Sequence, residues 1–254
     1  MKPWSLQGFR AVVTGATSWI GLATANELAA LGAEVLVVAR KAPDVEKTVQ
    51  ALRDGGRKAK GCAADLSTED GRRAVRACVD ELWGELHVLV NNVGMNIRAP
   101  TLEYPIESLR QLMSANLESA FGLCQLMHPH LRASRGAIVN VSSIASRTVV
   151  RMSTAAYSMT KGALDSMTDF LAVEWGADCI RVNSVHPWYI RTRLTEPVLS
   201  DDARRTRILE STPLGRIGEP EDVARVVAFL SMPAAAHVSG AHVPVDGAFE
   251  RVGI

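Results

Sequence analysis

A tyrosine and a lysine four residues apart, Tyr157 and Lys161, are the pair in this sequence best suited to proton transfer. They fall in an apolar run over residues 155–175 that predicts a helix, which places the two side chains on one face, one turn apart. A free phenol ionises near pH ~10 and exchanges protons poorly at neutral pH. An ammonium group one turn away favours the phenolate, so the sequence predicts that Lys161 lowers the pKa of Tyr157 toward the working range.

A serine and an asparagine stand where they can join this pair. Ser143 ends the β-branched run 138–143, as expected where a buried strand reaches its carboxyl edge, and Ser142 is a rival for the same role. Asn116 lies inside the helical run 109–126, where asparagine has poor intrinsic propensity. An asparagine that faces the sheet from within a helix can distort that helix and hold a water molecule.

The elements that must position these residues alternate regularly along the chain. Short apolar runs predict strands near residues 10–14, 34–39, 58–63, 87–91, 136–141, 180–186 and 241–245. Helical patterns fall near residues 19–31, 43–55, 68–83, 106–133, 155–177 and 220–232. Near-continuous Val/Ile/Leu strands between amphipathic helices are typical of a parallel sheet covered on both faces. With right-handed crossovers they predict a single α/β domain over residues 1–254, a doubly wound seven-stranded Rossmann-type sheet.

The segment 191–219 is richer in polar residues and turns than its surroundings. In doubly wound folds ligands bind outside the carboxyl ends of the strands, and an insertion after the sixth strand lies over that edge. We therefore expect a substrate lid here, with an ordinary exposed loop as the alternative.

The first strand runs into a turn suited to binding a pyrophosphate, between Thr14 and Gly21. The first glycine of this turn permits a tight bend, and the following helix offers unpaired N–H groups and the positive end of its dipole. The residues expected to contact the phosphates of a dinucleotide are Gly15, Thr17, Ser18, Trp19 and Ile20.

The sequence resembles the short-chain dehydrogenase/reductase family in the order of its motifs: TGxxxxxG from Thr14, NNxG from Asn91, then Asn116, Ser143 and the YxxxK of Tyr157. The match covers essentially the whole chain. Within the family the sequence is similar to tropinone reductase-like enzymes, in residues 4–6, 91–100, 187–190 and 212–220. The resemblance implies an oxidoreductase whose cofactor moves a hydride between its nicotinamide ring and a carbonyl carbon.

The resemblance also implies a role for each catalytic residue. Ser143 would donate a hydrogen bond to the substrate carbonyl oxygen, and Tyr157 would give or take the proton. Lys161 would hold the nicotinamide ribose, and Asn116 would hold a water that links to the lysine. Further cofactor contacts implied for the adenine, the riboses and the nicotinamide are Asp65, Leu66, Asn92, Gly94, Pro187, Ile190 and Thr192. The amide of Asn92 has a structural alternative, which is to satisfy backbone groups at the strand edge.

The sequence departs from the family pattern TGxxxGxG at the middle glycine, which is Trp19 here. That glycine normally lets the backbone approach the dinucleotide. An indole at this position either crowds the pyrophosphate, which we favour, or swings aside and lines the pocket. Restoring glycine is also expected to loosen the start of the helix by roughly 0.5–1 kcal/mol.

The end of the second strand indicates which dinucleotide is bound. NAD-preferring proteins carry an acidic residue about 20 residues past the glycines, where it holds the ribose 2′-hydroxyl. Here Ala39 stands 24 residues after Gly15, and Arg40 and Lys41 follow it. A missing carboxylate and an added guanidinium favour a 2′-phosphate, so the predicted cofactor is NADP(H).

Large apolar residues near the strand ends predict the substrate pocket and the assembly. The expected pocket residues, each of which also suits ordinary core, are Met95, Ile97, Trp188, Tyr189, Leu194 and Val198. Helical runs 106–133 and 155–177 carry apolar residues on more than one face, including Leu123, Leu126, Met127, Leu171 and Trp175. With the family resemblance, these faces predict a homodimer or a homotetramer.

Composition argues against several other classes of protein. The chain has 254 residues and a net charge of +1, so its charge does not indicate binding to nucleic acid or to an anionic membrane. Its four cysteines lack metal-ligand spacing, so no metal site is predicted, and His186 is interpreted as a satisfied histidine at a strand end. Without a leader or a long apolar span, the expected location is the cytoplasm.

The function expected from the sequence is NADPH-dependent reduction of a small or medium ketone or aldehyde to an alcohol. The alternative is a catalytically silent nucleotide-binding or scaffold protein whose cofactor binding is weakened by Trp19. The four catalytic residues favour the enzyme. An epimerase or dehydratase is disfavoured because the sequence offers no additional acid or base.

Overall fold

The computed structural model describes residues 2–150 and 152–252, and within them a single all-parallel sheet has the strand order β3-β2-β1-β4-β5-β6-β7. The strands are β1 Arg10–Thr14, β2 Glu34–Ala39, β3 Ala59–Ala63, β4 Val88–Asn91, β5 Ala137–Val141, β6 Arg181–Pro187 and β7 His242–Val245. All seven predicted strands are confirmed to within a residue or two. The order reverses between β1 and β4, which is the switch point where doubly wound folds bind ligands.

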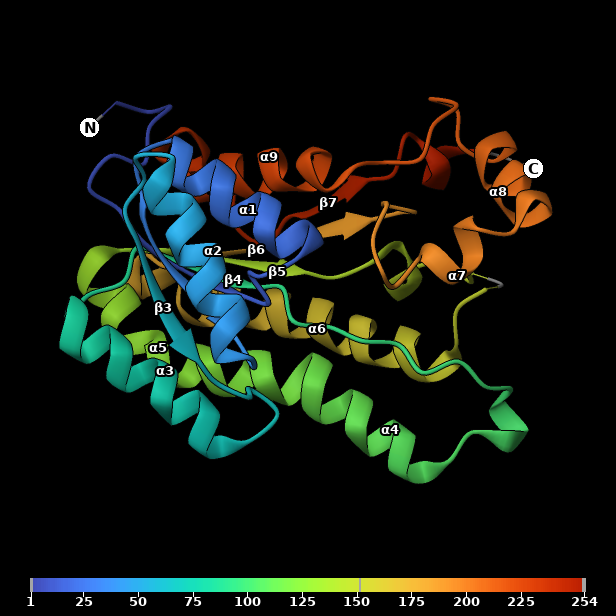
Figure 1. The fold of residues 1–254 in the computed structure, drawn as a ribbon, viewed down its shortest axis with the longest axis horizontal. Coiled ribbons are helices and arrows are strands. Elements are labelled where there is room, and N and C mark those ends of the chain that lie inside the picture. The colour runs from blue at the N-terminus through green and yellow to red at the C-terminus, as the bar shows by residue number, and fades with distance from the viewer. Residues whose placement is uncertain (1, 151, 253–254) are drawn as a thin grey trace.

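Helices cover both faces of the sheet (Figure 1). One face carries α1 Trp19–Ala30, α2 Ala42–Asp54 and α9 Pro220–Ser231. The other carries α3 Glu69–Leu82, α5 Ser119–Ser134 and α6 Ala155–Glu174, with α4 Ile106–Met113 preceding α5. Short 3-10 turns complete the described secondary structure at Thr101–Glu103, Ile144–Ser146, Gly176–Asp178, Pro233–Ala235 and Phe249–Arg251.

Strands β1, β2, β4 and β5 read as nearly continuous apolar runs because both of their faces are buried. Val12 on β1 is in register with Leu36 on β2 and Leu89 on β4, and all three pack beneath α3 and α5. Their neighbours along the chain, Val13 and Val37 among them, point into the opposite core beneath α1 and α9. Alternate residues thus fill two separate cores, which fixes the strand register and the sheet edge that carries the site.

Two helical regions differ from the sequence prediction. The run 106–133 is helical throughout, as predicted, but a π-helical segment, Ser114–Glu118, lies between α4 and α5. The polar segment 191–219 contains two short helices, α7 Glu196–Leu199 and α8 Asp202–Glu210, which lie beyond the tip of β6 (Figure 1). The periodicity of α8 is weak because Ile208 is its only buried residue.

Among the helices of the described residues, none combines the length and the apolar character needed to cross a membrane.

Candidate active site

The tyrosine and the lysine lie on one face of α6, as their spacing predicted. Thr154 caps the helix by accepting a hydrogen bond from the backbone N–H of Tyr157 at 3.2 Å. Lys161 is only 3% exposed, and its Nζ donates to the carbonyl oxygen of Val141 at 2.8 Å. The same Nζ lies 5.8 Å from the centroid of the Tyr157 ring. The C-terminal end of β5 therefore anchors the lysine beneath the phenol.

The electrostatics of this pair differ from the prediction made from sequence. Burial lowers the pKa of Lys161 to about 8, against the opposing charge of Asp165. Burial also raises the pKa of Tyr157 above its ordinary value, although Ser143 and the charge of Arg98 lower it in part. The net shift of the Tyr157 pKa is thus opposite to the expected lowering, because desolvation of the phenolate is the larger effect.

Asn116 lies in the π-helical segment, so the predicted distortion of the helix is confirmed. Its side chain is 1% exposed and hydrogen-bonds both backbone groups of Met95. Asn116 Oδ1 accepts from the Met95 N–H at 2.8 Å, and Nδ2 donates to the Met95 carbonyl at 2.9 Å. Nδ2 also donates to Thr160 Oγ1 at 3.1 Å. Asn116 thereby ties the loop after β4 to α6, behind the cavity wall.

The two serines after β5 have different partners. Ser142 is buried, and its hydroxyl donates to the backbone carbonyl of Lys161 at 3.2 Å. The Ser143 hydroxyl accepts from the Ala145 N–H at 3.1 Å, and Ser143 is near enough to Tyr157 to lower the pKa of the phenol in part. Ser143, rather than its neighbour, is therefore the serine that can act together with the tyrosine.

The turn after β1 has little room for side chains. Gly15 has φ +64°, and a Cβ on Gly21 would lie only 2.2 Å from the Gly15 carbonyl oxygen. Asn92 supports this turn, because its Nδ2 donates to the Thr14 carbonyl at 2.8 Å. The structural use of the Asn92 amide is therefore observed, while the residue also faces the cavity described below.

Trp19 occupies the family's glycine position in a conformation that suits glycine. Its φ is +49°, in the left-handed region that side chains disfavour, and its indole remains 43% exposed. The expectation that glycine would loosen this helix start is therefore wrong: glycine adopts such a φ without strain.

One large cavity of about 1250 Å³ joins the turn, the end of β2 and the catalytic face of α6. It is lined by three of the predicted catalytic residues, Ser143, Tyr157 and Lys161. Predicted cofactor residues that line it are Gly15, Thr17, Ser18, Trp19, Ile20, Arg40, Lys41, Asp65, Leu66, Asn92, Gly94, Pro187, Ile190 and Thr192. Predicted substrate residues that line it are Met95, Trp188, Tyr189 and Leu194.

Two predicted pocket residues lie elsewhere among the described residues. Val198, 2% exposed, packs into the core of the segment 191–219 together with Leu199 and Ile208. Ile97 is half-buried and is not among the residues that line the cavity; its backbone carbonyl accepts the Tyr104 hydroxyl at 3.0 Å. Val198 serves packing, because the short helix α7, which the sequence did not reveal, places it in that core.

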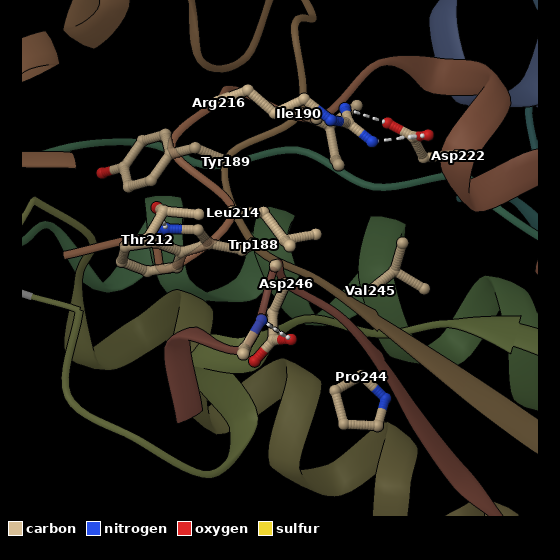
Figure 2. A pocket seen from close by; sticks show the side chains of 13 residues that line it. Trp188, Tyr189, Ile190, Thr212, Leu214, Arg216, Asp222, Pro244, Val245 and Asp246 are labelled. Atoms are coloured by element: carbon tan, nitrogen blue, oxygen red, sulfur yellow. Dashed lines mark hydrogen bonds and ion pairs between the residues drawn. The ribbon is translucent and has the colours of Figure 1, made fainter. Parts of the chain in front are cut away.

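Trp188 stands between the large cavity and a second one of about 360 Å³. Its Nε1 donates to Thr212 Oγ1 at 3.1 Å, and its ring stacks on Phe249 with centroids 3.6 Å apart. Figure 2 shows Trp188 beside Thr212 and Leu214 in this second cavity, with the Arg216–Asp222 ion pair nearby. The indole thus joins the segment 191–219 to the C-terminal segment as well as contributing to the large cavity.

Two residues of the site were missed by sequence reasoning. Thr160 accepts a hydrogen bond from Asn116. It could have been predicted from the sequence, because a residue three positions after Tyr157 lies beside that tyrosine on the helix face. Arg98 lines the cavity and donates to the carbonyls of Met152 and Leu194, at 3.3 and 3.0 Å. The sequence did offer a sign of this role, because Arg98 is a cation within residues 91–100, the stretch that follows the fourth strand.

Comparison with known proteins gives a family. A family model described as enoyl-(acyl carrier protein) reductase matches residues 15–250. A tropinone reductase homologue of Arabidopsis thaliana is 43% identical over 251 residues, which span 98% of this chain and 94% of that protein. The chain belongs to the short-chain dehydrogenase/reductase family. The tropinone reductase-like character expected from the sequence is also supported, since this relative carries that name.

Solved members of the short-chain dehydrogenase/reductase family share the whole fold. A putative NAD(P)-dependent gluconate 5-dehydrogenase from Beutenbergia cavernae with bound NADP has a TM-score of 0.94 and 35% identity, and the match covers 98% of this chain and 100% of that one. A 7α-hydroxysteroid dehydrogenase in complex with NADH and 7-oxo glycochenodeoxycholic acid has a TM-score of 0.92 and 30% identity, covering 96% and 95%. The doubly wound fold is therefore confirmed, and the protein is an oxidoreductase by family.

Proposed function

We propose that this protein is an NADPH-dependent carbonyl reductase that converts a ketone or aldehyde to an alcohol, reversibly, with Tyr157 as the proton donor or acceptor. The observation that carries the proposal is the placement of Ser143, Tyr157 and Lys161 along one cavity that continues to Arg40. When bound, the nicotinamide cofactor would supply the hydride.

The residues of the chain fit such a cofactor at both ends of the cavity. At one end, Arg40 lies beside Asp65, whose pKa is lowered first by the Ser67 hydroxyl, against burial, and also by the charge of Arg40. The end of β2 carries Ala39 in place of a carboxylate, with Arg40 and Lys41 directly after it, so a 2′-phosphate would meet cations there. At the other end, a Cβ on Gly94 would approach Lys161 Nζ to 3.3 Å, so glycine keeps this part of the cavity open.

In the proposed reaction each side chain has a defined task. Ser143 donates a hydrogen bond to the substrate carbonyl oxygen and keeps its proton, and Tyr157 transfers the single proton to that oxygen as it gains negative charge. Lys161 holds a positive charge beneath the phenol, which favours the tyrosinate left behind. Asn116 positions Met95, Thr160 and through them the cavity wall.

Arg98 supports a finer proposal about the substrate. Its guanidinium lines the cavity, and its charge acts on the pKa of both Tyr157 and Tyr189. A cation close to the reacting centre favours ketones that carry an anionic group over neutral ketones of the same shape. Apolar lining from Met95, Trp188 and Leu194 would hold the rest of such a substrate.

The remaining expectations stay proposals for this chain. Residues 191–219 would act as a lid, since Thr192, Arg193 and Leu194 border the cavity. The whole chain would act as one domain, in a homodimer or homotetramer located in the cytoplasm. The alternative, a silent nucleotide-binding protein, predicts NADPH binding without turnover.

The experiment is a panel of ketones and aldehydes with NADPH, which includes matched pairs with and without a carboxylate. Oxidation of NADPH at 340 nm with alcohol formed in equal amount supports the reductase, and faster turnover of the anionic member of each pair supports the role of Arg98. Binding of NADPH, followed by its fluorescence, with no turnover of any compound would favour the silent protein.

A further inference from the structure

Two histidines and an aspartate from three separate elements converge beneath the catalytic lysine. Asp165 lies on α6 one turn past Lys161, His186 lies on β6, and His242 opens β7. Asp165 Oδ1 lies 3.0 Å from His186 Nε2 and 3.7 Å from His242 Nδ1. One donor atom from each residue falls within 4.8 Å of the other two.

The Ser184 hydroxyl lies among the same atoms. Its Oγ is 3.0 Å from His186 Nε2 and 2.6 Å from His242 Nδ1. His186 is fully buried, and within the described residues its other ring nitrogen has no hydrogen-bond partner, so the cluster alone orients this ring. The four groups form a compact set of nitrogen and oxygen donors between α6 and the last two strands.

His242 also has the outer support that metal-binding histidines commonly show. Its Nε2 faces away from the cluster and lies 2.7 Å from Asp169 Oδ1, one further turn along α6. An Nε2–H bond to a carboxylate leaves Nδ1 as a lone-pair donor and fixes the ring orientation. The two carboxylates would offset the charge of a divalent cation placed between neutral imidazoles.

We propose that Asp165, His186 and His242 bind a divalent transition-metal ion of the zinc type, with Ser184 or a water at the fourth position. Imidazole and carboxylate ligands suit zinc, cobalt and nickel. Ligands 2.0–2.1 Å from a tetrahedral ion are roughly 3.3 Å apart, close to the two Asp165–histidine distances seen here. The bound ion would clamp α6, which carries Tyr157 and Lys161, to strands β6 and β7.

Spacing in the sequence did not reveal this set, because 21 residues separate Asp165 from His186 and the ligands meet only in the fold. The competing interpretation is a network of hydrogen bonds that needs no ion, in which His186 is the satisfied strand-end histidine expected from the sequence. The two interpretations differ in whether the protein binds a metal and whether binding depends on His242.

The test uses the full-length protein after treatment with a chelator. Co²⁺ is titrated while the visible spectrum is recorded, Zn²⁺ is then added in competition, and thermal unfolding is followed with and without Zn²⁺. We expect the absorption bands of a four-coordinate cobalt ion, their loss on addition of Zn²⁺, and a Tm that rises with Zn²⁺ concentration. His242→Gln should lower the affinity more than tenfold, and Asp169→Asn by about 10–100-fold.

Two control variants make the result specific. His128→Gln alters another histidine–aspartate pair, with Asp178 at 2.9 Å, and should leave metal binding unchanged. Cys78→Ser removes one of two thiols whose sulfurs lie 3.0 Å apart, the other being Cys62, and it should also leave binding unchanged. Absence of cobalt bands and of Zn²⁺ stabilisation would overturn the proposal. Binding that survives His242→Gln, or that is lost with Cys78→Ser, would overturn it equally.

Discussion

The ammonium group of Lys161 donates to the carbonyl oxygen of Val141 at 2.8 Å, which holds the lysine on the end of β5. The tyrosine of the same helix face is further away, with its ring centroid 5.8 Å from the ammonium nitrogen. A cation is thus buried with a backbone carbonyl as its partner. Burial of this charge has a cost that depends on pH.

The first prediction follows from that cost. The pKa of Lys161 lies at about 8, below its ordinary value of 10.5, because burial disfavours the charged form. Between these two values the unfolded chain binds a proton that the folded protein has released, so the free energy of unfolding gains up to about 1.4 kcal/mol per pH unit from this group. Chemical unfolding of the parent and of Lys161→Met across this range should show the gain in the parent only. Parallel pH profiles for the two proteins would contradict it.

The second prediction concerns Trp19. A residue other than glycine at positive φ costs about 1–2 kcal/mol, and glycine loses about 0.5–1 kcal/mol in chain entropy, so Trp19→Gly should be up to about 1.5 kcal/mol more stable than the parent. If the indole crowds the pyrophosphate, the variant should also have a lower NADPH dissociation constant.

Trp19→Ala is the matched control, because it removes the indole but keeps the strained φ. It should share the gain in NADPH affinity without the gain in stability. A Trp19→Gly protein that binds NADPH no better than the parent would rule out crowding and leave the indole as part of the pocket wall.

The third prediction concerns the choice of cofactor. Arg40 is exposed at the end of β2 and lines the cavity, where it can pair with a 2′-phosphate. Arg40→Ala should lower the preference for NADPH over NADH by about 1.5–3 kcal/mol, or one to two decades in relative kcat/KM. Arg57→Ala removes an exposed cation beyond α2 and should leave the ratio unchanged. A parent enzyme that uses NADH as efficiently as NADPH would refute the assignment.

The fourth prediction concerns assembly. Phe170 and Val173 on α6 are 72% and 84% exposed, which leaves an apolar patch without a partner in the described part of the chain. Phe170→Glu should shift sedimentation of the protein from a dimer or tetramer toward the monomer while its circular dichroism is retained. Leu102→Glu changes an equally exposed apolar residue outside this helix and should not. A parent protein that sediments as a monomer at micromolar concentration would contradict the prediction.

The fold was accessible from the sequence because its strands are buried on both faces. Alternate residues such as Val12 and Val13 fill opposite cores, so each strand reads as a short apolar run bounded by polar turns. The short helices of segment 191–219 were missed, in the case of α8 because it buries only Ile208 and therefore lacks a marked apolar periodicity. A π-helical segment has no pattern of its own in a sequence, and only the poor helix propensity of Asn116 indicated a distortion.

The site was predictable where a motif fixes its local geometry. Residues four apart in a helix always share a face, which places Tyr157 beside Lys161. The turn after β1 needs glycine where the backbone comes as close as it does at Gly21. Residues chosen only for being large and apolar were less reliable. The residues expected to form the assembly surface include Leu123 and Met127, which are fully buried within the chain.

The central claim is that Tyr157 transfers the proton in an NADPH-dependent carbonyl reduction, and its most direct test is Tyr157→Phe. Phenylalanine keeps the ring and removes the hydroxyl, whose pKa Ser143 influences. With the best carbonyl substrate from the panel, kcat should fall by about 10²–10⁴-fold, while the NADPH dissociation constant and the Tm stay near those of the parent. A Tyr157→Phe protein that reduces the same substrate at the rate of the parent would contradict the account.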